Sequence, residues 1–179
     1  SNYNSYNPLQ RRNIETAKTI GIQLIEKDLL KQALQLCLSL CNHSMGYLKS
    51  LAAIAIAKKF IELGHYNHAL KVAFQLAGLK GKPKVFTIKQ IGSEFVKVNQ
   101  IGNAKLVASY LSKNPSQEAP SFLNTLKLEI TQSQEGAQVT PETPLDQEEA
   151  ELIQEPIDTI ELNSQLHLQF LEELKASIQ

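Results

Sequence analysis

The sequence contains no tryptophan, one methionine and two cysteines, and none of its apolar runs is long. The longest, 51–57, ends at Lys58 and falls short of the roughly 20 residues that a membrane-spanning helix needs. Cys37 and Cys41 are too few and too close in sequence for a disulfide scaffold. No basic stretch followed by an apolar stretch opens the sequence, so we expect no secretory signal and a cytoplasmic location.

Signatures of catalysis are also missing. The sequence shows no nucleophile with a paired base and no glycine-rich phosphate loop, and its basic turn at 78–84 favours a solvated loop over a phosphate site. The residues that could ligate a metal do not follow a zinc-binding spacing: Cys37, Cys41, His43, His65 and His68. We therefore expect no enzyme activity, no metal and no cofactor.

The formal net charge of zero is the sum of two unlike parts. Residues 135–179 hold 11 acidic side chains and one basic side chain, which gives −10. Residues 1–134 hold 7 acidic and 17 basic side chains, which gives +10. A basic body with an acidic tail is typical of an interaction role, although a tail of this kind also keeps a protein soluble.

The body shows apolar residues at helical spacing and no sustained alternation of the kind found in strands. Asn7 and Pro8 offer an N-cap and a first-turn proline, and Asp28 is expected to cap the second helix. Turns rich in Gly, Asn and Pro separate seven expected helices, over residues 9–26, 29–42, 46–63, 66–78, 84–98, 101–113 and 119–132.

A repeat of 35–36 residues relates these helices in pairs. Gly21, Ala57 and Gly92 lie 36 and 35 residues apart in the first helix of each pair. In the second helix the same separations hold for three alanines, Ala33, Ala69 and Ala104. Small residues let two helices approach closely, and three units are about the minimum that buries a continuous core in a stacked array.

Hairpins of this kind resemble the tetratricopeptide repeat (TPR) family, whose helix–turn–helix unit has 34 residues. The middle unit carries most of the resemblance, through Ala57, Phe60, Gly64, Tyr66, Ala69 and Ala73. The chain departs from the family in the length of its units and in having no tryptophan. It also lacks the family's closing proline, which is replaced by Met45, Gly81 and Ser116.

The resemblance implies an all-α fold, a right-handed superhelical array of about three antiparallel helix hairpins with a capping helix and a C-terminal amphipathic helix. The expected divisions are a flexible N-terminus at 1–8, a TPR-like repeat domain at 9–133 with its capping helix at 119–132, an acidic linker at 134–156 and the amphipathic helix at 157–179.

A concave groove, lined by the first helix of each hairpin, is a further implication of the resemblance, and it would hold a peptide or an amphipathic helix. Four lysines among mostly apolar residues favour an acidic ligand. Ile22 and Ala55 stand where chaperone-binding members have asparagines, so we do not expect that specificity. We expect about half of the apolar residues to pack between hairpins instead. The residues assigned to the groove are Lys18, Ile22, Ile25, Leu51, Ile54, Lys58, Ile61, Phe86, Lys89, Val96 and Lys97.

The acidic tail divides at Pro156. Its first part, 134–156, is rich in Glu, Gln, Pro and Thr, which predicts an extended linker. The second part predicts a helix from residue 157 with a broad apolar face. We expect this helix to pack on the body, along the groove or as an end cap, and the alternative is docking on a different protein. The residues expected to dock are Ile157, Ile160, Leu166, Phe170, Leu171 and Leu174.

The sequence therefore predicts a non-catalytic protein-interaction module, an adaptor, scaffold or chaperone-like protein, whose acidic tail is a candidate regulator. An RNA-binding helical-repeat protein is the alternative, because pentatricopeptide hairpins of about 35 residues read RNA and the body carries +10. The inferred lining is largely Ile and Leu, without the polar side chains that read bases. We therefore expect a protein partner and no membrane partner.

Overall fold

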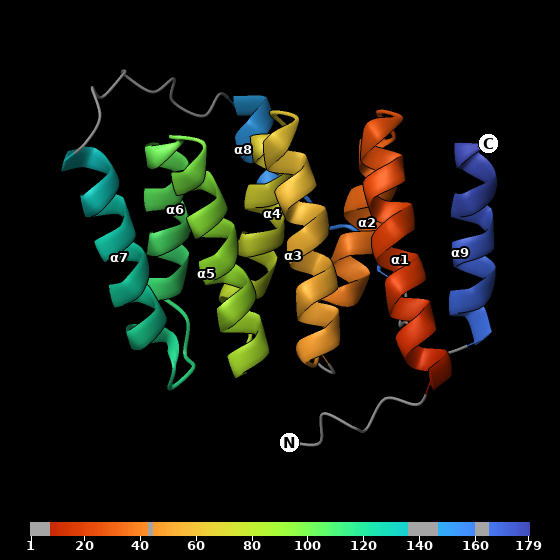
Figure 1. The fold of residues 1–179 in the computed structure, drawn as a ribbon, viewed down its shortest axis with the longest axis horizontal. Helices are drawn as coiled ribbons and strands as arrows, with labels where there is room; N and C mark the ends of the chain where they lie inside the picture. The colour runs from red at the N-terminus through yellow and green to blue at the C-terminus, as the bar shows by residue number, and fades with distance from the viewer. Residues whose placement is uncertain (1–7, 43–44, 136–146, 160–164) are drawn as a thin grey trace.

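The computed structural model describes residues 8–42, 45–135, 147–159 and 165–179, and these form α-helices joined by turns, without a strand (Figure 1). All seven helices expected in the body are present within three residues of their expected bounds, which confirms the all-α class. The helices are α1 (Pro8–Glu26), α2 (Leu30–Leu40), α3 (Tyr47–Glu62), α4 (Tyr66–Ala77), α5 (Lys82–Lys97), α6 (Ile101–Ser112), α7 (Ala119–Glu135), α8 (Gln147–Gln154) and α9 (Gln165–Ile178).

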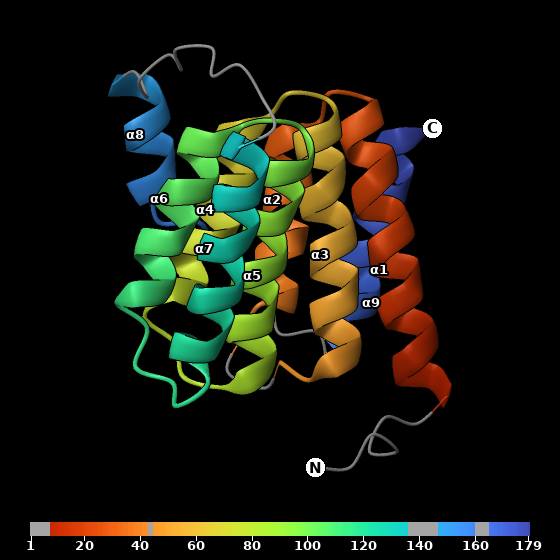
Figure 2. The ribbon, with the colours of Figure 1, turned by 60° about the vertical axis from the view of Figure 1, so that its left-hand side comes forward.

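The body consists of two layers of helices. The first layer contains α1, α3, α5 and α7 side by side, and the second contains α2, α4 and α6 (Figures 1 and 2). Within the second layer, α4 contacts α3 and α2, and α6 contacts α5 and α4. Helices α4 and α6 therefore each pack on the first helix of their own hairpin and on the preceding second helix. The apolar core lies between the layers.

Each hairpin closes with the same turn, which confirms the repeat. Asp28, Gly64 and Asn99 adopt positive φ angles of 61°, 84° and 59° at equivalent places. The next residue's N–H donates to the carbonyl five residues earlier, from Leu29 to Leu24 at 2.8 Å, from His65 to Phe60 at 2.8 Å and from Gln100 to Phe95 at 2.9 Å. These bonds satisfy carbonyls that the first helix leaves unpaired at its C-terminus.

Asp28 therefore has a different role from the one expected of it. The residue that precedes α2 is Leu29, and no side chain caps that helix. Asp28 forms the left-handed turn, a conformation that Asp and Asn tolerate better than most residues do. The expectation that Asp28 caps the second helix is wrong.

Small residues set the spacing within the first layer. A Cβ atom on Gly21 would lie 2.6 Å from Cδ1 of Ile56, and one on Gly92 would lie 2.6 Å from Cδ2 of Leu126. Leu126 follows Ile56 by 70 residues, which is two repeat units. Helix α7 therefore meets α5 in the register with which α3 meets α1, in the position that the first helix of a further hairpin would take.

The tail differs from its expected course. The expected linker contains α8, which packs against α4, so that part of the chain is not an extended linker throughout. The helix expected from residue 157 begins at Gln165 in α9, and residues 156–159 are not helical. Helix α9 packs on α1 at the N-terminal end of the array, as an end cap (Figure 1). Ile160 and the side chain of Leu166 lie outside the described residues.

Candidate functional site

The solvent-facing side of the first layer, here called the front face, holds most of the residues assigned to the groove. Ile25 and Ile61 are exceptions, because each is only 2% exposed and packs in the core. We remove these two from the candidate ligand contacts. The assigned residues that remain at least partly exposed are Lys18, Ile22, Leu51, Ile54, Lys58, Phe86, Lys89, Val96 and Lys97.

A row of aromatic rings crosses the front face. Tyr47 of α3 stacks on Phe86 of α5 with ring centroids 6.1 Å apart, and Phe86 meets Phe122 of α7 at 6.1 Å. Tyr47 is 47% exposed, and Leu51, one turn further along α3, is 42% exposed. Sequence reasoning missed Tyr47 and Phe122. The separation of 36 residues between Phe86 and Phe122 was the signal that could have found the latter.

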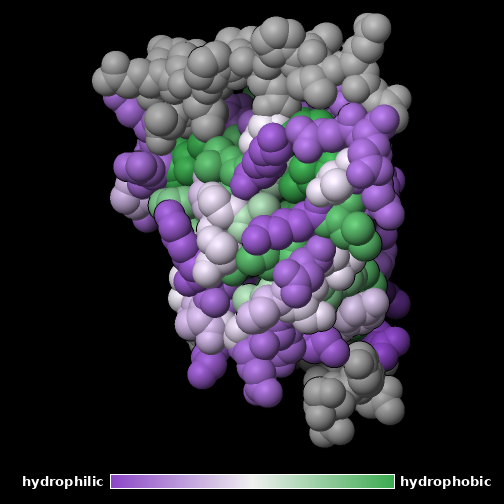
Figure 3. Space-filling model, turned by 90° about the vertical axis from the view of Figure 1, so that its left-hand side faces the viewer, coloured by the Kyte–Doolittle hydropathy of each residue, from purple (hydrophilic) through white to green (hydrophobic). Residues whose placement is uncertain are grey.

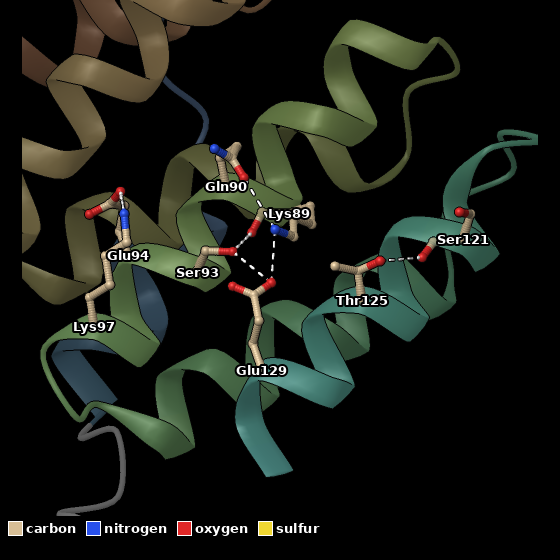
Figure 4. A network of polar contacts seen from close by, with 8 residues as sticks. All are labelled: Lys89, Gln90, Ser93, Glu94, Lys97, Ser121, Thr125 and Glu129. Atoms are coloured by element: carbon tan, nitrogen blue, oxygen red, sulfur yellow. Dashed lines mark hydrogen bonds and ion pairs between the residues drawn. The ribbon is translucent and has the colours of Figure 1, made fainter. Parts of the chain in front are cut away.

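The lysines of α5 are engaged within the protein (Figure 4). Nζ of Lys89 lies 2.8 Å from Oε2 of Glu129 on α7, and the Lys89 side chain is 13% exposed. The Ser93 hydroxyl donates to the same carboxylate oxygen at 3.2 Å. Lys97 pairs with Glu94 at 2.9 Å on its own helix. Lys89 therefore joins α5 to α7, and little of its charge is available to a ligand.

On α1, Lys18 forms a partly exposed pair with Glu15 at 2.9 Å. Lys58 of α3 is exposed and makes no ion pair with any described residue. Three of the four lysines assigned to the groove are thus paired inside the chain. The front face is a mainly apolar and aromatic surface with less free positive charge than the sequence suggested.

The tail helix α8 sits on the outer side of the second layer, away from the front face (Figure 2). Lys71 of α4, which is 1% exposed, binds the C-terminal end of α8. The Lys71 ammonium donates to the carbonyl of Ile153 at 2.7 Å and also to that of Glu155. Burial lowers the pKa of Lys71, and the charge of Glu155 opposes that shift. A cation at the C-terminus of a helix donates hydrogen bonds to unpaired carbonyls and interacts favourably with the helix dipole.

The second tail helix, α9, covers the side of α1 that faces away from α3. Phe170, Leu171 and Leu174 are 7%, 4% and 5% exposed, so these three expected docking residues are buried. Ile157, in the segment before α9, is partly buried against the core. Neither of the two described tail helices lies over the front face, so the tail does not occupy it there.

A groove between α6 and α7, here called the end groove, opens at the C-terminal end of the array and has a volume of about 460 Å³. Figure 3 shows this end of the molecule, where apolar surface is exposed between polar side chains. The wall from α6 consists of Lys105, Ala108, Ser109 and Ser112. The wall from α7 consists of Lys127, Ile130, Thr131 and Gln134.

The cysteines and histidines form no reactive centre among the described residues. Cys37 is buried and its thiol donates to the carbonyl of Ala53 at 3.6 Å; a hydrogen bond with Cys41, together with burial, raises the pKa of Cys37. Burial, reinforced by the charge of His65, lowers the pKa of His68 to about 4. Within the same part of the chain, no three His, Cys, Asp or Glu side chains are grouped to hold a metal ion.

Comparison with protein-family models, with curated proteins and with solved structures finds no match to this chain. The TPR-like interpretation therefore rests on the repeat alone. In the part of the chain that the structure describes, every helix is too short or too polar to span a membrane.

Proposed function

We propose that this chain is a non-catalytic protein-interaction module, an adaptor or scaffold of the TPR-like type, that binds a peptide or helix of another protein on its front face. The observation that carries the proposal is the row of Tyr47, Phe86 and Phe122, in which Tyr47 is exposed and the two phenylalanines are partly exposed, with the exposed Leu51 beside it. Aromatic side chains presented on a rigid helical layer are the groups that contribute most to protein interfaces.

On the front face, the charge distribution favours a protein ligand over RNA. Binding to a nucleic-acid backbone needs free cationic groups, because affinity comes largely from the release of counterions. Lys18, Lys89 and Lys97 are paired with carboxylates of the same chain. We therefore place the RNA-binding alternative second, and we assign to the tail the role of covering the body instead of competing for the front face.

A matched pair of variants tests the proposal. Leu51→Glu changes a leucine on the front face that is 42% exposed, and Leu63→Glu changes one at the end of α3 that is 47% exposed. Tagged full-length chains are used to capture partners, which are quantified by mass spectrometry. We expect Leu51→Glu to lose at least one partner about tenfold, as a central contact at an interface does, while Leu63→Glu retains it.

Two outcomes would contradict the proposal. One is equal recovery of every partner with both variants, which would mean that the front face makes no contact. The other is saturable, salt-dependent binding of the purified chain to a generic single-stranded RNA such as poly-uridine, lost with Lys58→Gln. That result would favour the RNA-binding function, because Lys58 is exposed and unpaired among the described residues.

A further inference from the structure

Among the described residues, α7 has no second helix that would pair with it as a hairpin. In the second and third hairpins, the second helix contacts its own first helix and the second helix of the preceding hairpin, as α6 contacts α5 and α4. A second helix following α7 in this pattern would lie against α7 and α6, which is the position of the end groove. The next described helix, α8, packs on α4 instead.

The end groove has the shape of a seat for a helix. Each wall is a stripe with spacing i, i+3, i+4, i+7 along one helix, so both walls extend for about two turns, or about 11 Å. Ala108 and Ile130, which are 8% and 6% exposed, form its apolar floor. A helix that packs at 8–10 Å from both neighbours would contact these two side chains in the manner of α4 and α6.

Charge defines the class of helix that fits. Lys105 and Lys127 stand on opposite walls, both are exposed, and neither makes an ion pair with a described residue. None of the described residues that line the groove is acidic. An apolar floor between two unpaired cations is complementary to a helix with an apolar face flanked by Asp or Glu.

We propose that the end groove binds an acidic amphipathic α-helix of another protein, which pairs with α7 as the second helix of a further hairpin. The described tail helices are acidic but do not supply this ligand, because their apolar side chains are already used. Ile153, Phe170, Leu171 and Leu174 are 4–7% exposed in their present positions on the same molecule. A second copy of the chain therefore has no free acidic apolar helix among its described residues.

The test uses the full chain, labelled with ¹⁵N, and a synthetic peptide of about 18 residues. The peptide has Leu at helical spacing on one face and Glu on both flanks, and the control peptide has Lys in place of Glu. We expect saturable amide shifts concentrated in α6 and α7 with the Glu peptide only. Lys105→Glu together with Lys127→Glu should weaken its binding about tenfold, because two favourable rim contacts become repulsive.

Two control variants complete the design: a pair of lysine substitutions away from the end groove, and a substitution on the front face. Lys27→Glu with Lys31→Glu makes the same change in net charge at exposed sites of the first hairpin and should leave the dissociation constant unchanged. Leu51→Glu should also leave it unchanged, which separates this proposal from the one for the front face. The amide spectrum of each variant shows whether it is folded.

Five results would overturn the proposal, four of them in the peptide experiment. Those four are no saturable shifts with about 1 mM of the Glu peptide, shifts centred on the front face, equal weakening by both lysine pairs, or equal binding of the Lys peptide. A dimer in light scattering that dissociates with Lys105→Glu and Lys127→Glu would also overturn it, because the occupant would then be a second copy.

Discussion

The two ends of the helical array differ in how their outer helix is covered. At the N-terminal end, α9 covers α1 and buries Phe170, Leu171 and Leu174. At the other end no described helix covers the outer side of α7, where Leu128 is 57% exposed. Stacked repeats leave an apolar face at each end that must be covered or made polar. This chain uses its own tail at one end and leaves a groove at the other.

A polar clamp holds the open end in place of a covering helix. The Asn114 amide donates to the carbonyls of Leu76, Ala77 and Leu79 at 3.3, 2.8 and 2.9 Å. The N–H of Gly81 donates to the hydroxyl of Ser116 at 2.9 Å. The loop that leads into α7 is thereby fixed to the turn between α4 and α5. The difference between the ends indicates that apolar cover stabilises one and that hydrogen bonds position the other.

Removal of the cover should have the largest effect. Deletion of 165–179 exposes the side of α1 that α9 buries, and we expect a loss of about 3 kcal/mol in the free energy of unfolding. Each buried apolar side chain contributes about 1.5–3 kcal/mol, and the released chain entropy offsets part of the sum. Urea unfolding measures the loss, with Glu172→Gln, at an exposed position on α9, as the control. An unchanged midpoint would mean that α9 does not pack on α1 in solution.

Breaking the clamp should have the second largest effect. Asn114→Ala removes the side-chain donor from the carbonyls of Leu76, Ala77 and Leu79, of which that of Leu76 keeps a backbone donor, the N–H of Leu79 at 3.0 Å; we expect a loss of about 2 kcal/mol in the free energy of unfolding. Hydrogen exchange should rise mainly in α7 and in the turn before α5, because the clamp joins these two. Asn124→Ala, at an exposed position of α7, is the matched control. Uniform exchange across the whole array would contradict a role confined to the open end.

The same contrast shows what the sequence could predict. The helices follow from the spacing of apolar residues along the chain, and the hairpins follow from the 35–36-residue repeat of small residues, two of which, Gly21 and Gly92, lie against a helix of the next unit. Helix α8 was missed because its contacts are distant. Lys71, which caps it, lies 82 residues before Ile153, and a stretch rich in Glu and Pro gives no local sign of that partner.

The candidate site was predicted in part for the same reason. Spacing predicted Leu51 and Lys58, which are exposed, and Phe86, which is partly exposed. It could not show that Lys89 pairs with Glu129, because that partner lies 40 residues further on in α7. The end groove was also missed. It lies between two packed helices, α6 and α7, and only the packed structure shows that no other described helix covers it.

Acid should weaken the first two hairpins, near the covered end, more than the open end. Burial and the charge of His65 lower the pKa of His68 to about 4, and Asp28 opposes this shift. The unfolded chain therefore binds a proton at His68 more readily than the folded protein does. The stabilisation that this difference provides is complete above about pH 6.5 and is lost as the pH falls towards 4. We expect a loss of about 1 kcal/mol in the free energy of unfolding, which is reduced because solvent screens a half-buried ring. Thermal unfolding from pH 7 to 4 measures it, and a slope unchanged by His68→Gln would contradict this origin.

The smallest effect should come from the uncovered face itself. Leu128→Asp changes a side chain that is 57% exposed on α7, and we expect a loss below about 0.5 kcal/mol because little apolar surface is buried there. Leu126→Asp, two residues earlier, is the contrasting variant; Leu126 is fully buried beside Gly92, and its replacement should cost several times more. Urea unfolding at two protein concentrations compares them. A loss above about 1.5 kcal/mol for Leu128→Asp, with a midpoint that depends on concentration, would show that a second copy covers this end and that the two ends are alike in solution.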